Sequence, residues 1–237
     1  MPVWGWRTPA TDIPEQYLGT FRIVKRDVKM GTAWPMCRTF GYDYCIFMND
    51  TKLTILQEKR GGEWRDWMVD SPYDWYAMGE FALRTQASNV LVGGLGLSLI
   101  LHHLFLRRDI AKITVVELNK EIIDLVSSYI PKDDRVEIVH GDFLKVVPEL
   151  ASKDKKYDTV IMDMWTGEDR ECVDLFNKAF EVVSNFYPSS INLFHSFQRL
   201  IDTEIVNTHF KTGLDGPLRF IPEDLSRAAL QRRQSTQ

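Results

Sequence analysis

The sequence has few cysteines, no long apolar run and no strong excess of charge of one sign. Its 237 residues include three cysteines, Cys37, Cys45 and Cys172. Their odd number and their spacing exclude a disulfide scaffold and favour reduced, partly buried thiols. No run approaches the roughly 18 apolar residues of a membrane span, and the first residues lack the basic and apolar regions of a signal peptide. We therefore expect a cytoplasmic protein that does not enter a membrane.

The charge balance is mildly acidic, with 29 lysines and arginines against 33 aspartates and glutamates and a net charge of −4. This balance makes nucleic acid an unfavoured partner. The composition, 44% hydrophobic and 26% charged, is that of an ordinary globular protein with enough apolar material for a core. At roughly 150 residues per domain, the length indicates one large domain, or a domain plus a smaller module.

The pattern of apolar residues changes near residue 86. Before that point the chain shows short β-rich runs at 21–24, 43–48, 52–57 and 64–69. Asn49-Asp50 and Gly61-Gly62 lie between consecutive runs, which predicts a meander of antiparallel strands. We therefore assign residues 1–85 to a small N-terminal β-rich module and residues 86–237 to a second domain.

The second domain alternates short apolar strands with helical stretches. The predicted strands are 89–92, 113–117, 136–139, 157–163 and 191–194, and the predicted helices are 97–107, 120–129, 143–152 and 170–185. Continuous apolar strands that alternate with helices indicate a parallel sheet covered on both faces. The predicted fold class is thus α/β, a Rossmann-like, doubly wound, mostly parallel sheet. About 40 residues follow the last predicted strand, so the sheet is expected to be truncated at its C-terminal edge.

Glycines or acidic residues stand at the ends of four successive predicted strands. The first strand ends in a glycine turn containing Gly93, Gly94 and Gly96. Glu117 ends the second strand, about 20 residues further on, where a carboxylate can accept hydrogen bonds from both ribose hydroxyls of a nucleoside. Asp142 and Asp163 follow the third and fourth strands. Because ligands of such sheets bind at the carboxyl ends of the strands, this pattern predicts a nucleoside-containing cofactor.

The glycine turn does not match the dinucleotide fingerprint, because Leu99 stands where that pattern needs its third glycine. The segments VLVGGLGLSL at 90–99, VVELN at 115–119, DRVEIVHGDF at 134–143 and YDTVIMD at 157–163 instead resemble the class I S-adenosylmethionine-dependent methyltransferase superfamily. The resemblance is greatest to its spermidine synthase-like branch. It implies S-adenosylmethionine, or its decarboxylated form, as the cofactor.

The resemblance also implies a role for each site residue. Gly93, Gly94 and Gly96 would run beside the amino acid part of the cofactor, and Glu117 would hold its ribose. Asp142 with Phe143 would frame the adenine, and Asp163, the candidate catalytic residue, would lie beside the reacting sulfonium. The N-terminal module resembles the small domain of aminopropyltransferases that closes over the polyamine site. By this likeness residues 73–75 would approach the pocket, although an aromatic cluster of this kind is more often part of the core.

Two departures bear on the reaction. Spermidine synthases have an acid in the glycine turn that receives the ammonium of the aminopropyl group, whereas this chain has Leu95 and Gly96 there. After the fourth strand it keeps Asp163 and loses the other acids of the family loop. We therefore favour methyl transfer to a small-molecule acceptor over aminopropyl transfer to a polyamine. A non-catalytic protein that binds a nucleoside or a partner is the third hypothesis.

Other features leave alternatives open. An acidic groove for a polyamine could come from Asp158, Asp163, Glu168 and Asp169, although these acids fit a strand end and a helix start equally well. His102 and His103 are expected to be packing or surface residues, while His140 and His195 would lie near the pocket. No metal-ligand spacing is present. The oligomeric state stays open, though proteins with this module commonly form homodimers.

Overall fold

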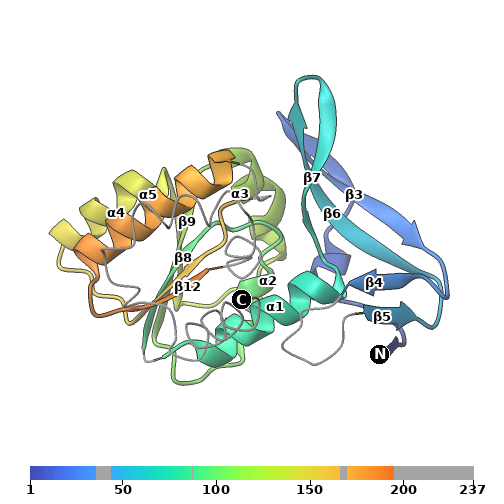
Figure 1. Cartoon of the computed structure of the whole chain (residues 1–237), viewed down its shortest axis with the longest axis horizontal. Coiled ribbons are helices and arrows are strands. Elements are labelled where there is room, and N and C mark those ends of the chain that lie inside the picture. Colours follow the sequence, from blue (N-terminus) through green and yellow to red (C-terminus); the bar gives the residue numbers. More distant parts are fainter. Residues whose placement is uncertain (36–43, 87, 166–169, 195–237) are drawn as a thin grey trace, which may run out of the picture.

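A computed structural model describes residues 1–35, 44–86, 88–165 and 170–194. Within them, a five-stranded parallel sheet has the order β10-β9-β8-β11-β12 (Figure 1). Its strands are β8 (Asn89–Gly93), β9 (Lys112–Glu117), β10 (Val136–His140), β11 (Thr159–Met162) and β12 (Ile191–Phe194). The chain moves outward from β8 to β10 and then returns to the other side of β8 at β11. This reversal is the topological switch point of a Rossmann-like sheet, so the predicted fold class is confirmed.

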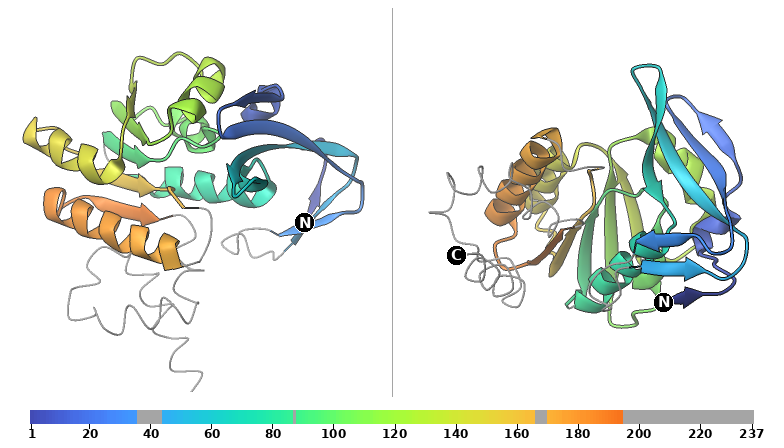
Figure 2. Two further views of the ribbon diagram at one scale, coloured as in Figure 1. Left: turned by 90° about the horizontal axis from the view of Figure 1, so that it is seen from above. Right: turned by 45° about the vertical axis from the view of Figure 1, so that its right-hand side comes forward.

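Helices cover both faces of the parallel sheet. One face carries α1 (Pro72–Arg84), α2 (Leu99–Phe105) and α3 (Lys120–Val126), which is followed by the 3₁₀ helix η3 (Ser127–Tyr129). The other face carries α4 (Phe143–Ser152) and α5 (Arg170–Phe186), which lie side by side (Figures 1 and 2). Within β8, Val90 and Val92 join the first core and Leu91 joins the second, because successive side chains of a strand point to opposite faces.

The N-terminal residues form two further sheets. The larger one, in the antiparallel order β2-β3-β6-β7, contains β2 (Gln16–Leu18), β3 (Phe21–Val28), β6 (Thr51–Arg60) and β7 (Glu63–Val69). The smaller one, in the order β1-β5-β4, contains β1 (Pro2–Val3), β4 (Ala33–Pro35) and β5 (Tyr44–Phe47). A 3₁₀ helix, η1, spans Pro9–Asp12.

The predicted meander is wrong at two connections, because β5 lies in a different sheet from both β3 and β6. The Gly61-Gly62 turn does join β6 to β7 as a hairpin, but β5 and β6 belong to different sheets. The side chains between them bind distant backbone groups instead of closing a hairpin: Gly5 N–H donates to Asn49 Oδ1 at 2.8 Å, and Met30 N–H donates to Asp50 Oδ1 at 2.9 Å. These bonds turn the chain from one sheet to the next.

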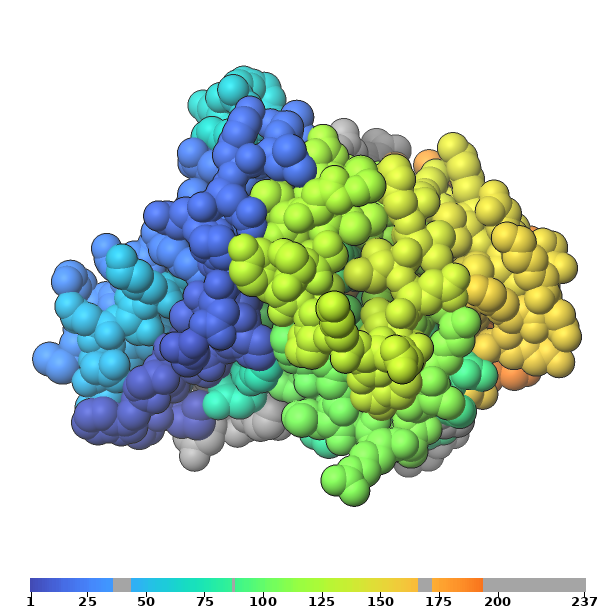
Figure 3. Space-filling model, turned by 180° about the vertical axis from the view of Figure 1, so that it is seen from behind, coloured from blue at the N-terminus to red at the C-terminus, as the bar shows by residue number. Residues whose placement is uncertain are grey.

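The N-terminal strands lie directly against the parallel-sheet part of the chain. Phe21, Ile23 and Leu56 share one continuous apolar core with α1, α2 and α3. Gln16 Nε2 also donates a hydrogen bond of 2.8 Å to the carbonyl oxygen of Leu125 at the end of α3. From behind, Figure 3 shows the blue N-terminal residues against the yellow-green segment around α3. The division of the chain after residue 85 stays a prediction.

Three further predictions can be compared with the described residues only in part. Cys45 and Cys172 are free and buried, while Cys37 lies outside the described residues. The expected truncation of the sheet concerns residues 195–237, which are also outside them. Among the helices described, none combines the length and apolar character that crossing a bilayer requires.

Candidate functional site

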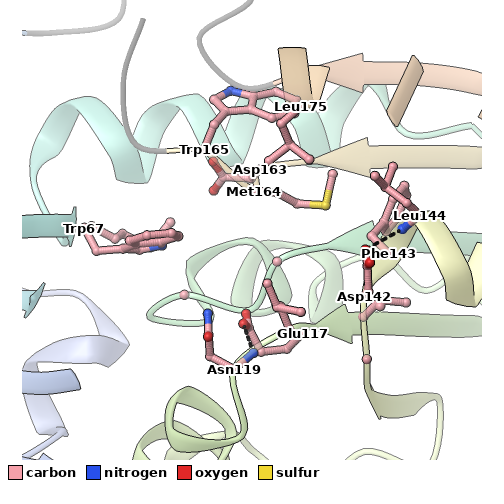
Figure 4. Close-up of a pocket in the computed structure, with 16 residues that line it drawn as sticks. Trp67, Glu117, Asn119, Asp142, Phe143, Leu144, Asp163, Met164, Trp165 and Leu175 are labelled. Carbon is pink, nitrogen blue, oxygen red and sulfur yellow. Dashed lines mark hydrogen bonds between the residues drawn. The ribbon is translucent and has the colours of Figure 1, made fainter. Parts of the chain in front are cut away.

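The carboxyl ends of β8, β9, β10 and β11 meet around one pocket (Figure 4). Six of the seven predicted site residues line it: Gly94, Gly96, Glu117, Asp142, Phe143 and Asp163. The seventh, Gly93, lies just behind the wall, since a Cβ atom on it would stand 2.9 Å from the Phe143 ring. The structure therefore brings together residues that are up to 70 positions apart in the chain. Their individual roles stay predictions.

Glu117 is a buried carboxylate at the end of β9, with 4% of its surface exposed. Its Oε2 accepts a 2.8 Å hydrogen bond from Leu95 N–H, and its Oε1 accepts one of 2.8 Å from Asn119 N–H. Burial raises the pKa of Glu117, and these two hydrogen bonds act in the opposite direction. Hydrogen bonds from Gly96 N–H and from the Asn119 side chain act in the same direction. Glu117 therefore braces the glycine turn and joins it to the end of β9.

Close packing at the strand ends requires glycine at two positions of the turn. Gly94 has a φ of +92°, and a Cβ atom there would lie 2.2 Å from the carbonyl oxygen of Asp163. A Cβ atom on Gly93 would lie 2.7 Å from the sulfur of Met164. Asp163 N–H also donates to the carbonyl oxygen of Gly93 at 2.9 Å. The glycine turn and the strand end that carries Asp163 are thus held as one unit.

Gly96 makes a different close approach, to a side chain from the N-terminal sheet. Its φ is +50°, and a Cβ atom there would lie 2.7 Å from the sulfur of Met68. The next residue, Leu97, donates its backbone N–H to the same sulfur at 3.2 Å. Of Leu95 and Gly96, the two residues expected where spermidine synthases carry an acid, the second is thus a glycine with a thioether packed against it.

Asp142 and Phe143 form the far side of the pocket, at the start of α4. Asp142 is the N-cap residue, and its Oδ1 accepts from Leu144 N–H at 3.0 Å. Its other oxygen lies 3.7 Å from Lys145 Nζ. Phe143 is buried, with 4% of its surface exposed, and packs over Gly93. This end of the site offers an apolar ring beside a capped carboxylate.

Two residues of the pocket, Trp67 and Met68, were not singled out from the sequence. Both come from β7, in the N-terminal sheet, and line the pocket. Figure 4 shows Trp67 across the pocket from Asp142 and Phe143. The segment expected from the resemblance to approach the pocket, residues 73–75, instead lies on α1, and none of its residues is in the pocket lining. Trp75 packs on His103 there, with ring centres 4.0 Å apart. Trp75 thus agrees with the core alternative, since it packs against the core beneath α1.

Other candidates lie away from the pocket or outside the described residues. Asp158 stands before β11, at the opposite end from Asp163, and accepts backbone N–H bonds from Ser88 and Asn89 at 3.0 and 2.8 Å. Glu168, Asp169 and His195 are not among the described residues. His102 and His103 are packing residues of α2, as expected, and burial lowers the pKa of His102 to about 4. His140 contacts the Leu118 carbonyl oxygen at 3.1 Å and does not line the pocket.

The residues present fit an adenosine-type cofactor. A buried carboxylate stands at the end of the second strand, and an apolar ring stands beside the third. Both face the switch point of the sheet, where such ligands bind. In the part of the chain that the structure describes, no three side chains that bind metals are clustered.

Residues 77–185 match the family model described as the spermine/spermidine synthase domain. The chain is 30% identical over 117 residues to the polyamine aminopropyltransferase of Clostridium botulinum (strain Eklund 17B / Type B), covering 47% of this chain and 37% of that protein. It is 34% identical over 82 residues to the polyamine aminopropyltransferase of Korarchaeum cryptofilum (strain OPF8), covering 32% and 24%. The chain thus spans 37% of the length of one curated relative and 24% of the other. These matches confirm the resemblance to the spermidine synthase-like branch.

Two solved structures show partial likeness to the fold. A putative caffeoyl-CoA O-methyltransferase from Staphylococcus aureus is 16% identical with a TM-score of 0.42, covering 57% of this chain and 63% of that one. The mitomycin 7-O-methyltransferase is 16% identical with a TM-score of 0.41, covering 52% and 36%.

Proposed function

We propose that this protein is an S-adenosylmethionine-dependent transferase that moves a methyl group to a small-molecule acceptor. The observation that carries the proposal is the contact between Met68 and the glycine turn. At the position where aminopropyl transfer needs an acid, Gly96 has no side chain, and the Met68 sulfur fills the space that one would take. The ammonium of a decarboxylated cofactor would find no counter-charge in this turn.

The same contact favours a cofactor that keeps its carboxylate. Leu97 N–H donates to the Met68 sulfur at 3.2 Å, and a thioether is a weak acceptor. A ligand carboxylate would be a stronger partner for that N–H, because hydrogen bonds to charged acceptors are about twice as strong as neutral ones. S-Adenosylmethionine carries such a carboxylate and its decarboxylated form does not.

The chain's own residues would bind the cofactor and position the acceptor. Glu117 would hold the ribose hydroxyls, and Phe143 would cover the adenine. The cofactor supplies a carbon on a positively charged sulfur, and the acceptor displaces the neutral thioether. Catalysis then depends on holding the acceptor in line with the reacting carbon and on removing its proton. Asp163, which follows β11 and lines the pocket, would take this proton.

Aminopropyl transfer to a polyamine is the second candidate, because both curated relatives are named polyamine aminopropyltransferases. Calorimetric titration of the full chain with each cofactor separates the two. We expect S-adenosylmethionine to bind at least tenfold more tightly than its decarboxylated form. Tighter binding of the decarboxylated form would refute methyl transfer, and binding of neither would favour the non-catalytic hypothesis.

A double variant sharpens this test. Gly96→Asp with Met68→Ala supplies the missing acid and the space for it, and aspartate tolerates the left-handed backbone better than most residues. The preference should shift toward the decarboxylated cofactor. Met68→Ala alone is the matched control, because it opens the space without adding a charge.

The role of Asp163 is tested by comparison with Asp158, at the opposite end of the same strand. Asp163→Asn should abolish formation of S-adenosylhomocysteine and leave the circular dichroism spectrum unchanged. Asp158→Asn removes a carboxylate that only bonds backbone N–H groups, so it should lower stability and preserve turnover. Full turnover in Asp163→Asn would remove this residue from the mechanism.

A further inference from the structure

Trp67 lies at an irregularity in the β6–β7 hairpin. Gln57 pairs with Asp66, and the next residue back on β6, Leu56, pairs with Met68, so Trp67 has no partner across the strand. This is a β-bulge, which bends a strand and redirects its side chains. In a regular strand, neighbouring residues face opposite sides. The bulge explains why Trp67 and Met68, although consecutive, both line the pocket.

The indole ring of Trp67 is held in place by its neighbours. Phe21, which is fully buried, meets it edge to face with ring centres 6.0 Å apart. The Arg60 guanidinium lies 5.2 Å from the centre of the Trp67 ring. In Figure 4 the ring stands at one end of the pocket, across from Asp142, Phe143 and Leu144 and on the same side as Asp163. Trp67 is therefore a fixed surface at the end of the pocket where an acceptor would enter.

The pocket wall formed by the described residues contains three carboxylates, on Glu117, Asp142 and Asp163, and no cationic side chain. Two of them, on Glu117 and Asp142, accept backbone hydrogen bonds. The other large side chains of this wall include Trp67, Met68, Met164, Trp165 and Leu175. The Arg60 guanidinium, which also pairs with Glu58, lies against the Trp67 ring.

A polyamine lying on Trp67 would bring its ammonium groups close to a guanidinium, that of Arg60, which already lies against this ring. Each ammonium group that leaves water needs a counter-charge and hydrogen-bond acceptors, or its desolvation remains uncompensated. A flat ring without positive charge needs neither, and it gains contact with an aromatic surface that loses no side-chain freedom on binding.

We propose that Trp67 is the platform on which the acceptor lies, and that the acceptor is a planar aromatic molecule without positive charge. Naming this ligand the acceptor rests on the methyl-transfer function proposed above; the binding site itself does not. The bulge in β7 is then the device that sets substrate specificity, because it delivers Trp67 to the pocket from outside the cofactor-binding sheet.

The test measures binding of 2-naphthol and of spermidine to the full chain by calorimetry, with and without saturating S-adenosylhomocysteine. We expect 2-naphthol to bind more tightly than spermidine, and Trp67→Ala to weaken 2-naphthol binding at least tenfold. Trp64→Ala is the matched control: Trp64 is on the same strand, stacks with Arg22 at 4.2 Å, and is not in the pocket lining. It should leave 2-naphthol binding unchanged.

Trp67→Leu keeps most of the apolar volume and removes the aromatic face, so it serves if Trp67→Ala does not fold. Trp67→Phe should restore most of the affinity. Tighter binding of spermidine, or equal effects of Trp67→Ala and Trp64→Ala, would overturn the proposal.

The cofactor titration separates this proposal from the proposed function. If S-adenosylhomocysteine binds and 2-naphthol does not, the aromatic platform is wrong and the transferase hypothesis stands. If S-adenosylhomocysteine does not bind, the transferase hypothesis fails, and the 2-naphthol titration without it still decides the platform. Trp67→Ala should change S-adenosylhomocysteine affinity less than threefold, because Trp67 stands opposite the residues expected to frame the adenine.

Discussion

Gly94→Ala tests whether the glycine turn and the strand end carrying Asp163 are built as one unit. Gly94 has a φ of +92°, and its missing Cβ atom would stand 2.2 Å from the carbonyl oxygen of Asp163. The hairpin residue Gly62 has nearly the same backbone angle, +89°, with no atom within 4 Å of the added Cβ. The two substitutions therefore share the backbone strain and differ in the steric clash.

The magnitudes follow from these two contributions. An alanine in this backbone region costs about 1–2 kcal/mol, so Gly62→Ala should lower the free energy of unfolding by that amount. Overpacking adds about 1–3 kcal/mol, and here the obstacle is backbone that cannot rotate away. Gly94→Ala should therefore cost about 4 kcal/mol in total.

Urea denaturation followed by circular dichroism gives both free energies, with the slope of each transition checked for a change in two-state behaviour. A loss for Gly94→Ala within about 1 kcal/mol of the loss for Gly62→Ala would show that the clash is relieved cheaply. In that case the turn and the Asp163 segment move independently, and the argument that they form one unit is wrong.

Three further outcomes are expected. Glu117→Gln should weaken S-adenosylhomocysteine binding about tenfold or more in calorimetry, because it removes a charged acceptor; an unchanged affinity would rule out ribose binding by Glu117. Burial raises the pKa of Asp70 to about 6. The folded state therefore holds this proton more tightly than the unfolded state, which adds about 3 kcal/mol to the free energy of unfolding at low pH. This stabilisation should be lost as pH rises from about 4 to about 6. Urea midpoints of wild type and Asp70→Asn across that range measure this, and parallel curves would contradict it. Tyr157→Phe removes the 2.9 Å hydrogen bond that the Tyr157 hydroxyl donates to Thr114 Oγ1, so it should lower the free energy of unfolding by about 1–2 kcal/mol. An unchanged urea midpoint would mean that this buried bond contributes nothing to stability.

The parallel sheet could be predicted closely from the sequence, because its strands are buried on both faces and appear as uninterrupted apolar runs. The bounds of α4 and β12 agree with the predicted 143–152 and 191–194. The acids at the strand ends could be placed together for the same reason, since parallel strands end at one edge of a sheet.

The N-terminal side of the pocket could not be predicted in this way. The run WRDWMV at 64–69 reads as an ordinary strand, and nothing in it marks the bulge at Trp67, which depends on pairing with β6. Helix α1 was also missed, although Ser71 as N-cap and Pro72 at the first turn are local signals for its start. The contact of Met68 with Gly96 joins two sheets and has no local signal at all.

The β6–β7 hairpin brings its two pocket residues from a sheet that shares no strand with the residues expected to bind the cofactor. Its turn, Gly61-Gly62, has open space around it. Chimeras can therefore exchange the hairpin of one such protein for that of another while the parallel sheet stays intact. If the platform is correct, the range of accepted molecules will follow the donor of the hairpin, and the affinity for the cofactor will follow the donor of the sheet.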